Sequence, residues 1–175
     1  DDIKFAGQTS AVRTDIVPAL ESVFGKLTYS TDVFTNTGVR HRRSADGSIT
    51  MDQDEYIKAL KPISHPSMIG AKPEQFADES LKATYWSLLG AAAYMLITQF
   101  WLSVYIVALQ RRTQNPQMIH IKRLNAVVRF AQRYPASIVF SAMTPTGTLE
   151  MQSDSGFTKE QENGYGIRGS NLMRH

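Results

Sequence analysis

The first part of the chain combines a short apolar stretch with a helical pattern. Residues 3–7 are mostly apolar and end at glycine, which predicts a short strand. Within residues 9–24 apolar side chains recur at helical spacing after two candidate cap residues, which predicts an amphipathic helix. Gly25 is expected to end this helix, and Pro18 to kink it or delay its start.

A hairpin and a short helix are predicted next. Residues 33–43 contain Thr and Val with polar side chains at alternate positions, which suits a single strand. The turn signal Ala-Asp-Gly-Ser at 45–48 separates it from a second strand at 49–51. An Asp at the start and Pro62 after the end predict a helix over residues 52–60, followed by a loop.

The middle of the chain is predicted to be helical. Residues 78–112 contain no proline, and residues 88–109 are almost continuously apolar, which predicts one long helix or a bent pair. Between Pro116 and Pro135 a further helix is expected. Its predicted apolar face consists of Leu124, Val127, Val128 and Ala131.

Strand-like patterns return towards the end. Residues 137–140 and 148–152 are strand candidates on either side of a turn at 144–147, and the glycine-rich tail to His175 is expected to hold one more strand. Helical and strand-like segments together predict an α+β fold.

Composition narrows the class of protein. A chain of 175 residues with 42% hydrophobic and 20% charged residues is long enough for one or two small folded domains. The absence of cysteine excludes disulfides, thiolate metal sites and thiol nucleophiles, and it fits an intracellular protein in the cytoplasm or nucleus. The opening Asp-Asp, without a Met start or signal peptide, suggests a piece of a longer protein.

Charge is distributed unevenly along the chain. The net charge is +3, yet residues 80–149 hold seven basic residues and no acidic one, so this segment is expected to attract a polyanion. Six of its basic residues are candidate phosphate contacts: Arg111, Arg112, Lys122, Arg123, Arg129 and Arg133. Three more stand together in the predicted hairpin: Arg40, Arg42 and Arg43. The alternative is that such basic runs are only solvated faces.

Histidine and aromatic residues give no further site. The four histidines show no spacing typical of a metal site or a catalytic triad, so they are predicted to be polar surface or helix residues: His41, His65, His120 and His175. Three aromatic residues in the apolar helical region are predicted to belong to the core: Trp86, Tyr94 and Trp101.

A membrane-spanning segment is the main rival interpretation of residues 88–109. Twenty-two largely apolar residues can cross a bilayer, and the basic pair that follows would favour a cytoplasmic C-terminal side. Thr98 and Gln99 near the middle, together with Gly90 and Ser103, favour a buried helix instead. A single-pass membrane protein therefore stays as an alternative.

Four stretches, in order, resemble the polymerase of copia-type LTR retrotransposons. Residues 1–7 resemble the family's Tyr-Val-Asp-Asp-Ile-Leu-Ile-Ala-Gly, and residues 34–57 resemble the segment that ends in a Gln-x-x-Tyr-Ile helix. Residues 85–94 resemble Tyr-Arg-x-Leu-Val-Gly-Ser-Leu-x-Tyr, with Asn-Pro, His and Lys-Arg-Leu at the family's spacing in 115–124. Residues 152–157 resemble the Tyr-Ser-Asp-Ala-Asp-Trp that opens RNase H. The order and spacing carry the resemblance more than any single stretch.

The chain also departs from that family pattern. Residues 98–102 are Thr-Gln-Phe-Trp-Leu where the family has Thr-Arg-Pro-Asp-Ile, and Gly156 replaces the second Asp of the RNase H opening. These differences suggest a divergent or decaying copy of such an element.

The resemblance implies four parts. Residues 1–51 would be the end of a reverse-transcriptase palm and a hairpin, and 52–79 a thumb-like helix and loop. Residues 80–149 would be a helical connection, and 150–175 the first strands of an RNase H-like domain. The parent would be an RNA-directed DNA polymerase with RNase H activity.

The same resemblance implies the site residues and the metal. Asp1 and Asp2 would be two of the polymerase's Mg²⁺ ligands, with a further Asp expected upstream, and Asp154 would be the first RNase H carboxylate. Both sites would be incomplete here, so the chain alone is expected to be inactive. Without the resemblance, Asp-Asp is a common solvated dipeptide and Asp154 an ordinary turn residue.

The implied partners are nucleic acids and the parent polyprotein. An RNA template, a DNA primer, an RNA–DNA hybrid and the rest of the pol polyprotein are expected partners, and a membrane is not. A non-catalytic nucleic-acid-binding remnant is the second alternative.

The predicted role of Asp154 has a direct test. In a longer protein that continues through RNase H, Asp154→Asn should abolish Mg²⁺-dependent cleavage of an RNA–DNA hybrid, because the amide holds the metal poorly. Binding of the hybrid should be largely retained in a filter assay. Cleavage at the wild-type rate would remove Asp154 from the site.

Overall fold

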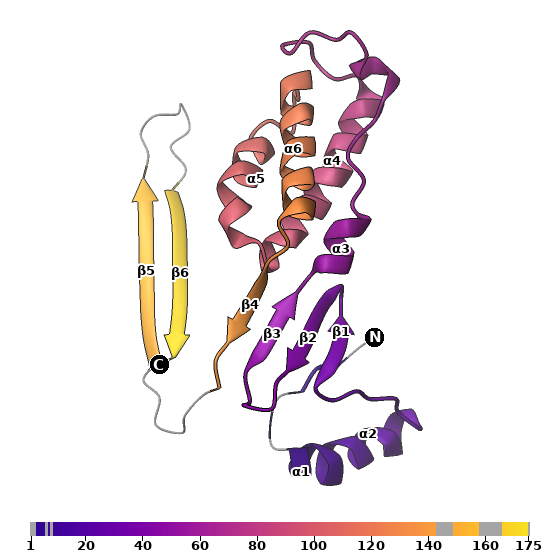
Figure 1. The fold of residues 1–175 in the computed structure, drawn as a ribbon, viewed down its shortest axis with the longest axis vertical. Coiled ribbons are helices and arrows are strands. Elements are labelled where there is room, and N and C mark those ends of the chain that lie inside the picture. The colour runs from indigo at the N-terminus through magenta and orange to yellow at the C-terminus, as the bar shows by residue number, and fades with distance from the viewer. Residues whose placement is uncertain (1–2, 6, 8, 143–148, 158–165, 175) are drawn as a thin grey trace.

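The computed structural model describes most of the chain. The described residues are 3–5, 7, 9–142, 149–157 and 166–174. In the main body a four-stranded antiparallel sheet lies between the N-terminal helical segment and a group of helices, and a separate two-stranded hairpin follows (Figure 1). The predicted α+β class is confirmed.

The N-terminal helical segment agrees with the sequence pattern. Helix α1 (Thr9–Ala11), a π-helical turn (Val12–Ile16) and α2 (Val17–Phe24) follow one another without a break. The wide π turn ends two residues before Pro18, which stands in the first turn of α2 and cannot donate a backbone hydrogen bond. Gly25, with a φ of 79°, ends the helix as predicted.

The predicted strand over residues 3–7 is wrong for the residues that are described. Residues 3–5 have no regular secondary structure. A strand requires hydrogen bonds to a neighbour, and no described strand pairs with this segment.

The sheet has the order β1 (Val33–Asn36), β2 (Val39–Arg43), β3 (Ile49–Asp52), β4 (Ser137–Phe140). The prediction of one strand over 33–43 is wrong, because a two-residue turn divides it. Thr37 and Gly38 both have positive φ, 48° and 80°, as a tight hairpin turn requires. Thr is rare at such a position, so the residue pattern did not predict the turn.

Strand β4 joins the sheet from far along the chain. Its residues pair with β3, Ser137 opposite Asp52 and Phe140 opposite Ile49. The strand itself was predicted, but its partner was not. This pairing places the first and third of the four predicted parts in one sheet.

Helix α3 (Asp54–Ala59) confirms the short predicted helix. It starts two residues late, because Asp52 is the last residue of β3 and Gln53 occupies the N-cap position. A loop with one 3-10 turn (Pro66–Met68) leads to α4 (Glu79–Tyr94), whose first turn is capped by the Asp78 carboxylate.

The long apolar run forms a bent pair of helices. After α4 come two 3-10 turns (Met95–Ile97 and Phe100–Leu102) and then α5 (Ser103–Gln110). Thr98 and Gln99 lie at the bend and are fully buried. Thr98 Oγ1 donates a hydrogen bond of 3.0 Å to Gln53 Oε1, which compensates part of the cost of burying these groups. Among the described residues, no helix has the length and hydrophobicity needed to cross a bilayer.

Helix α6 (Met118–Arg133) packs against α4 and α5 and completes the core. Of its predicted apolar face, Leu124, Val128 and Ala131 are fully buried and Val127 is partly buried. Its polar core residue, Asn125, holds the loop after α3. Asn125 Oδ1 accepts from the Ile63 N–H at 2.7 Å, and its amide donates to the Ile63 carbonyl at 2.8 Å.

The C-terminal hairpin consists of β5 (Leu149–Phe157) and β6 (Gly166–Arg174). The predicted strands near 148–152 and in the tail are confirmed, and β5 runs further than predicted. Asp154 lies inside β5, opposite Gly169 of β6. The predicted turn at 144–147 and Thr148 lie outside the described residues.

The two hydrogen bonds between the Asn125 side chain and the Ile63 backbone should contribute strongly to stability. Asn125→Ala leaves the buried N–H and carbonyl of Ile63 without partners, so the free energy of unfolding should fall by about 2–4 kcal/mol in urea denaturation. The exposed Asn115→Ala should change it by less than about 0.5 kcal/mol. Equal losses in the two variants would contradict this role.

Candidate nucleic-acid interface

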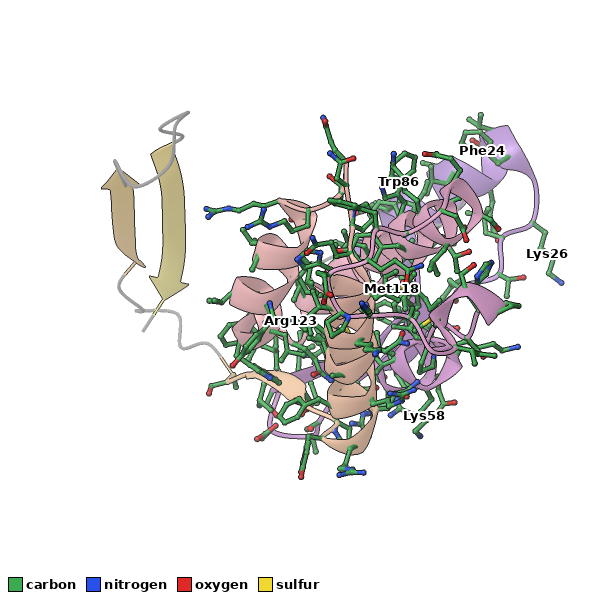
Figure 2. All side chains as sticks on the ribbon, turned by 90° about the horizontal axis from the view of Figure 1, so that it is seen from above. Phe24, Lys26, Lys58, Trp86, Met118 and Arg123 are labelled. Carbon is green, nitrogen blue, oxygen red and sulfur yellow. The ribbon has the colours of Figure 1, made fainter. Side chains whose placement is uncertain are left out.

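The exposed side of α6 carries a row of basic residues. Lys122, Arg129 and Arg133 recur at helical spacing and are exposed, and Arg123 stands beside Lys122. Figure 2 labels Arg123 on this helix. Within the described ranges no carboxylate lies within ion-pair distance of these four side chains. They are therefore available for phosphate groups.

The end of α5 adds two further cations. Arg111, the C-cap residue of α5, and Arg112 directly after it are exposed at the C-terminal end of the helix, where the backbone dipole favours positive charge. The described part of the chain offers neither of them an ion-pair partner. Burial, and then the charges of Arg112 and Arg123, lower the pKa of His120. The end of α5 and the start of α6 thus share one region of positive potential.

An aromatic pair borders the basic row. Phe130 and Tyr134 are about half exposed, and their ring centroids lie 4.7 Å apart at an interplanar angle of 44°. Basic side chains beside exposed aromatic rings are typical of surfaces that bind single-stranded nucleic acid. The sequence interpretation missed this pair, although its spacing of four residues on a helix with basic neighbours was visible.

The hairpin arginines are placed differently. Arg40 and Arg42 both contact the buried carboxylate of Asp52, each with a nitrogen 3.1 Å from an oxygen. Arg40 lies opposite Asp52 in the sheet, and Arg42 two residues further along the same face of β2. Two of the three predicted contacts in this cluster are thus engaged within the sheet. Arg43 is exposed, and among the described residues it has no ion pair.

His41 is buried, so its prediction as a surface residue is wrong. Its ring stacks on Phe34, with centroids 4.8 Å apart, and Nδ1 lies 3.1 Å from the Val39 carbonyl. Nε2 lies 2.7 Å from Lys4 Nζ and accepts its hydrogen bond. Burial, and then the charge of Lys4, lower the pKa of His41. The neutral ring thereby ties the N-terminal segment to the sheet.

The side chains of the predicted Mg²⁺ ligands lie outside the part of the chain that the structure describes. Asp1 and Asp2 lie outside the described residues, and only the backbone of Asp154 is described. The remaining described residues contain no group of three His, Asp or Glu side chains that fits a metal ion. The described residues therefore present basic and aromatic chemistry rather than a carboxylate site.

Comparisons with known proteins add no assignment. No protein-family model, no curated protein and no solved structure matches the chain. The candidate interface therefore rests on the positions, exposure and charge of the residues described above.

The two histidines with lowered pKa values predict a pH dependence. Below the ordinary histidine pKa of 6.5 the unfolded chain takes up protons before the folded one, so the free energy of unfolding should fall between about pH 7 and pH 5. The double variant His41→Gln/His120→Gln should show a flatter profile in this window. An unchanged slope, measured by urea denaturation at each pH, would contradict the assignment.

Proposed function

We propose that this chain binds nucleic acid through the end of α5 and the exposed side of α6. The residues of this basic face are Arg111, Arg112, Lys122, Arg123, Arg129 and Arg133. The observation that supports the proposal is that these six cations are exposed at the end of α5 and along one side of α6, with no carboxylate partner among the described residues. Each phosphate that such a cation neutralises releases counterions, and this release favours binding.

The dimensions of the face suit a nucleic-acid backbone. From Lys122 to Arg133 the helix rises by roughly 16 Å at about 1.5 Å per residue. This length corresponds to about five steps of a nucleic-acid strand at about 3.4 Å each. The aromatic pair Phe130 and Tyr134 beside the arginines offers a stacking surface for bases.

The parent activity in this proposal comes from the resemblance. A copia-type polymerase would copy an RNA template from a DNA primer and degrade the RNA strand. The basic face would then hold the template–primer or the RNA–DNA hybrid. The ordered matches along the sequence support this reading, and so does the position of Asp154 within a strand. In that parent, Asp1, Asp2 and Asp154 would hold Mg²⁺.

A non-catalytic nucleic-acid-binding remnant is the second candidate function. The replacement of the family's Thr-Arg-Pro-Asp-Ile by residues 98–102, with Thr98 and Gln99 buried at the bend, favours it. Both candidates use the same basic face. Mg²⁺-dependent primer extension by a longer protein that contains this chain would distinguish them.

The basic face predicts a steep salt dependence. The affinity for a single-stranded oligonucleotide, followed by fluorescence anisotropy, should fall with rising salt with a log–log slope of about 3–5 in magnitude. Arg129→Gln/Arg133→Gln should weaken binding at low salt and reduce the slope by roughly 1–2, because two phosphate contacts are lost.

A matched control removes the same charge elsewhere. Arg13→Gln/Lys58→Gln changes exposed basic residues outside the face and should leave the slope within error of the wild type. A salt-independent affinity, or an equal effect of the two double variants, would refute the basic face.

A further inference from the structure

A small depression lies where α4 meets the loop between α5 and α6. Its volume is about 360 Å³ and it is open to solvent. It is lined by Trp86, Leu89, Gly90, Gln110, Thr113 and Gln114. The sequence predicted Trp86 to be a core residue, but the side chain is 48% exposed and forms one wall of this pocket.

The Trp86 ring is held in a fixed orientation. Its Nε1 donates a hydrogen bond of 2.7 Å to the Thr113 carbonyl. Lys82 Nζ lies 5.3 Å from the ring centroid, in a cation–π contact. Lys82 precedes Trp86 by one helical turn and Gly90 follows it by one turn, so the cation and the pocket lie towards opposite ends of the helix. The pocket side of the indole therefore stays free for a ligand.

Gly90 creates the space beside the indole. A Cβ atom built at this position meets no heavy atom within 4 Å, and the residue lies inside α4 with ordinary helical backbone. A helix with an internal glycine is less stable than the same helix with alanine. Neither crowding nor backbone conformation therefore explains why position 90 is a glycine. Its local effect is to leave the pocket open, since any longer side chain would occupy it.

The chemistry of the lining suits a planar ring with polar edges. Trp86 and Leu89 supply apolar surface, while the amides of Gln110 and Gln114 can donate and accept hydrogen bonds. Arg111 and Arg112 belong to the segment between these two glutamines and extend the positive region to the pocket. A nucleobase stacks on aromatic rings and carries a phosphate that these arginines would attract.

We propose that this pocket takes one unstacked base of a single-stranded nucleic acid. The proposal rests on the proposed function, because the basic face would hold the strand whose base enters the pocket. The base would stack on Trp86 and meet the glutamine amides with its polar edge. The neighbouring phosphates would lie at Arg111 and Arg112.

The test follows Trp86 fluorescence in a Trp101→Phe background, which leaves one tryptophan. A short thymidine oligonucleotide should quench Trp86, whereas an abasic strand of the same length should bind without quenching. The thymidine strand should bind at least about ten-fold more tightly, because the pocket contributes one stacked base beyond any stacking on Phe130 and Tyr134. Thymidine monophosphate at the same concentration should not quench, because it lacks the backbone contacts.

Gly90→Leu should fill the pocket. It should lose the quenching and about ten-fold in affinity for the thymidine strand, while binding of the abasic strand stays unchanged. Its thermal midpoint should not fall, because leucine favours the helix more than glycine does. Thr84→Leu, on the far side of α4 from Trp86, is the matched control and should behave as the wild type.

The outcomes separate the pocket from the basic face. Equal, salt-dependent binding of the two strands would refute the pocket and leave the basic face intact. Wild-type preference in Gly90→Leu would refute the pocket as well, and quenching by the mononucleotide alone would show a site for free nucleotides instead. Failure of both strands to bind would overturn the pocket together with the proposed function.

Discussion

The bend at Thr98 and Gln99 is the constraint on which the helical part of the structure depends. Both side chains are fully buried, and Thr98 reaches Gln53, which also donates to the Tyr94 carbonyl. Burying a polar group costs free energy unless it finds a partner, and Gln53, which follows the sheet directly, supplies that partner for Thr98 where the apolar run turns. The turn lets α5 fold back against α4, and α6 then closes the core against both helices.

The packing of the core determines which basic side chains have no carboxylate neighbour among the described residues. Helix α6 buries one face among apolar side chains, so its basic residues remain on the opposite face, where no described carboxylate reaches them. In the sheet, cross-strand pairing places Arg40 and Arg42 beside the buried Asp52, and both form ion pairs with its carboxylate. The hairpin arginines and the basic face have similar composition. They differ in availability, because of these residues only Arg40 and Arg42 have an acidic neighbour in the part of the chain that the structure describes.

The same packing forms the pocket beside this face. The loop after α5 brings the Thr113 carbonyl to the Trp86 indole and fixes the ring, while Gly90 keeps the adjoining surface open. The pocket and the basic face share the segment around Arg111 and Arg112. The segment from Gln110 to Gln114 thus connects the pocket at Trp86 with the cations at the end of α5.

The sequence by itself determined the features that depend on local spacing. The helices at 9–24 and 118–133, the helical character of the apolar run and the row of cations follow from periodicity and charge, which neighbouring residues carry. Only the tertiary structure decided the turn at Thr37, the pairing of β3 with β4, the use of Arg40 by Asp52 and the pocket at Trp86. These features arise between segments distant along the chain or from an unusual backbone angle, and neither leaves a periodic signal in the sequence.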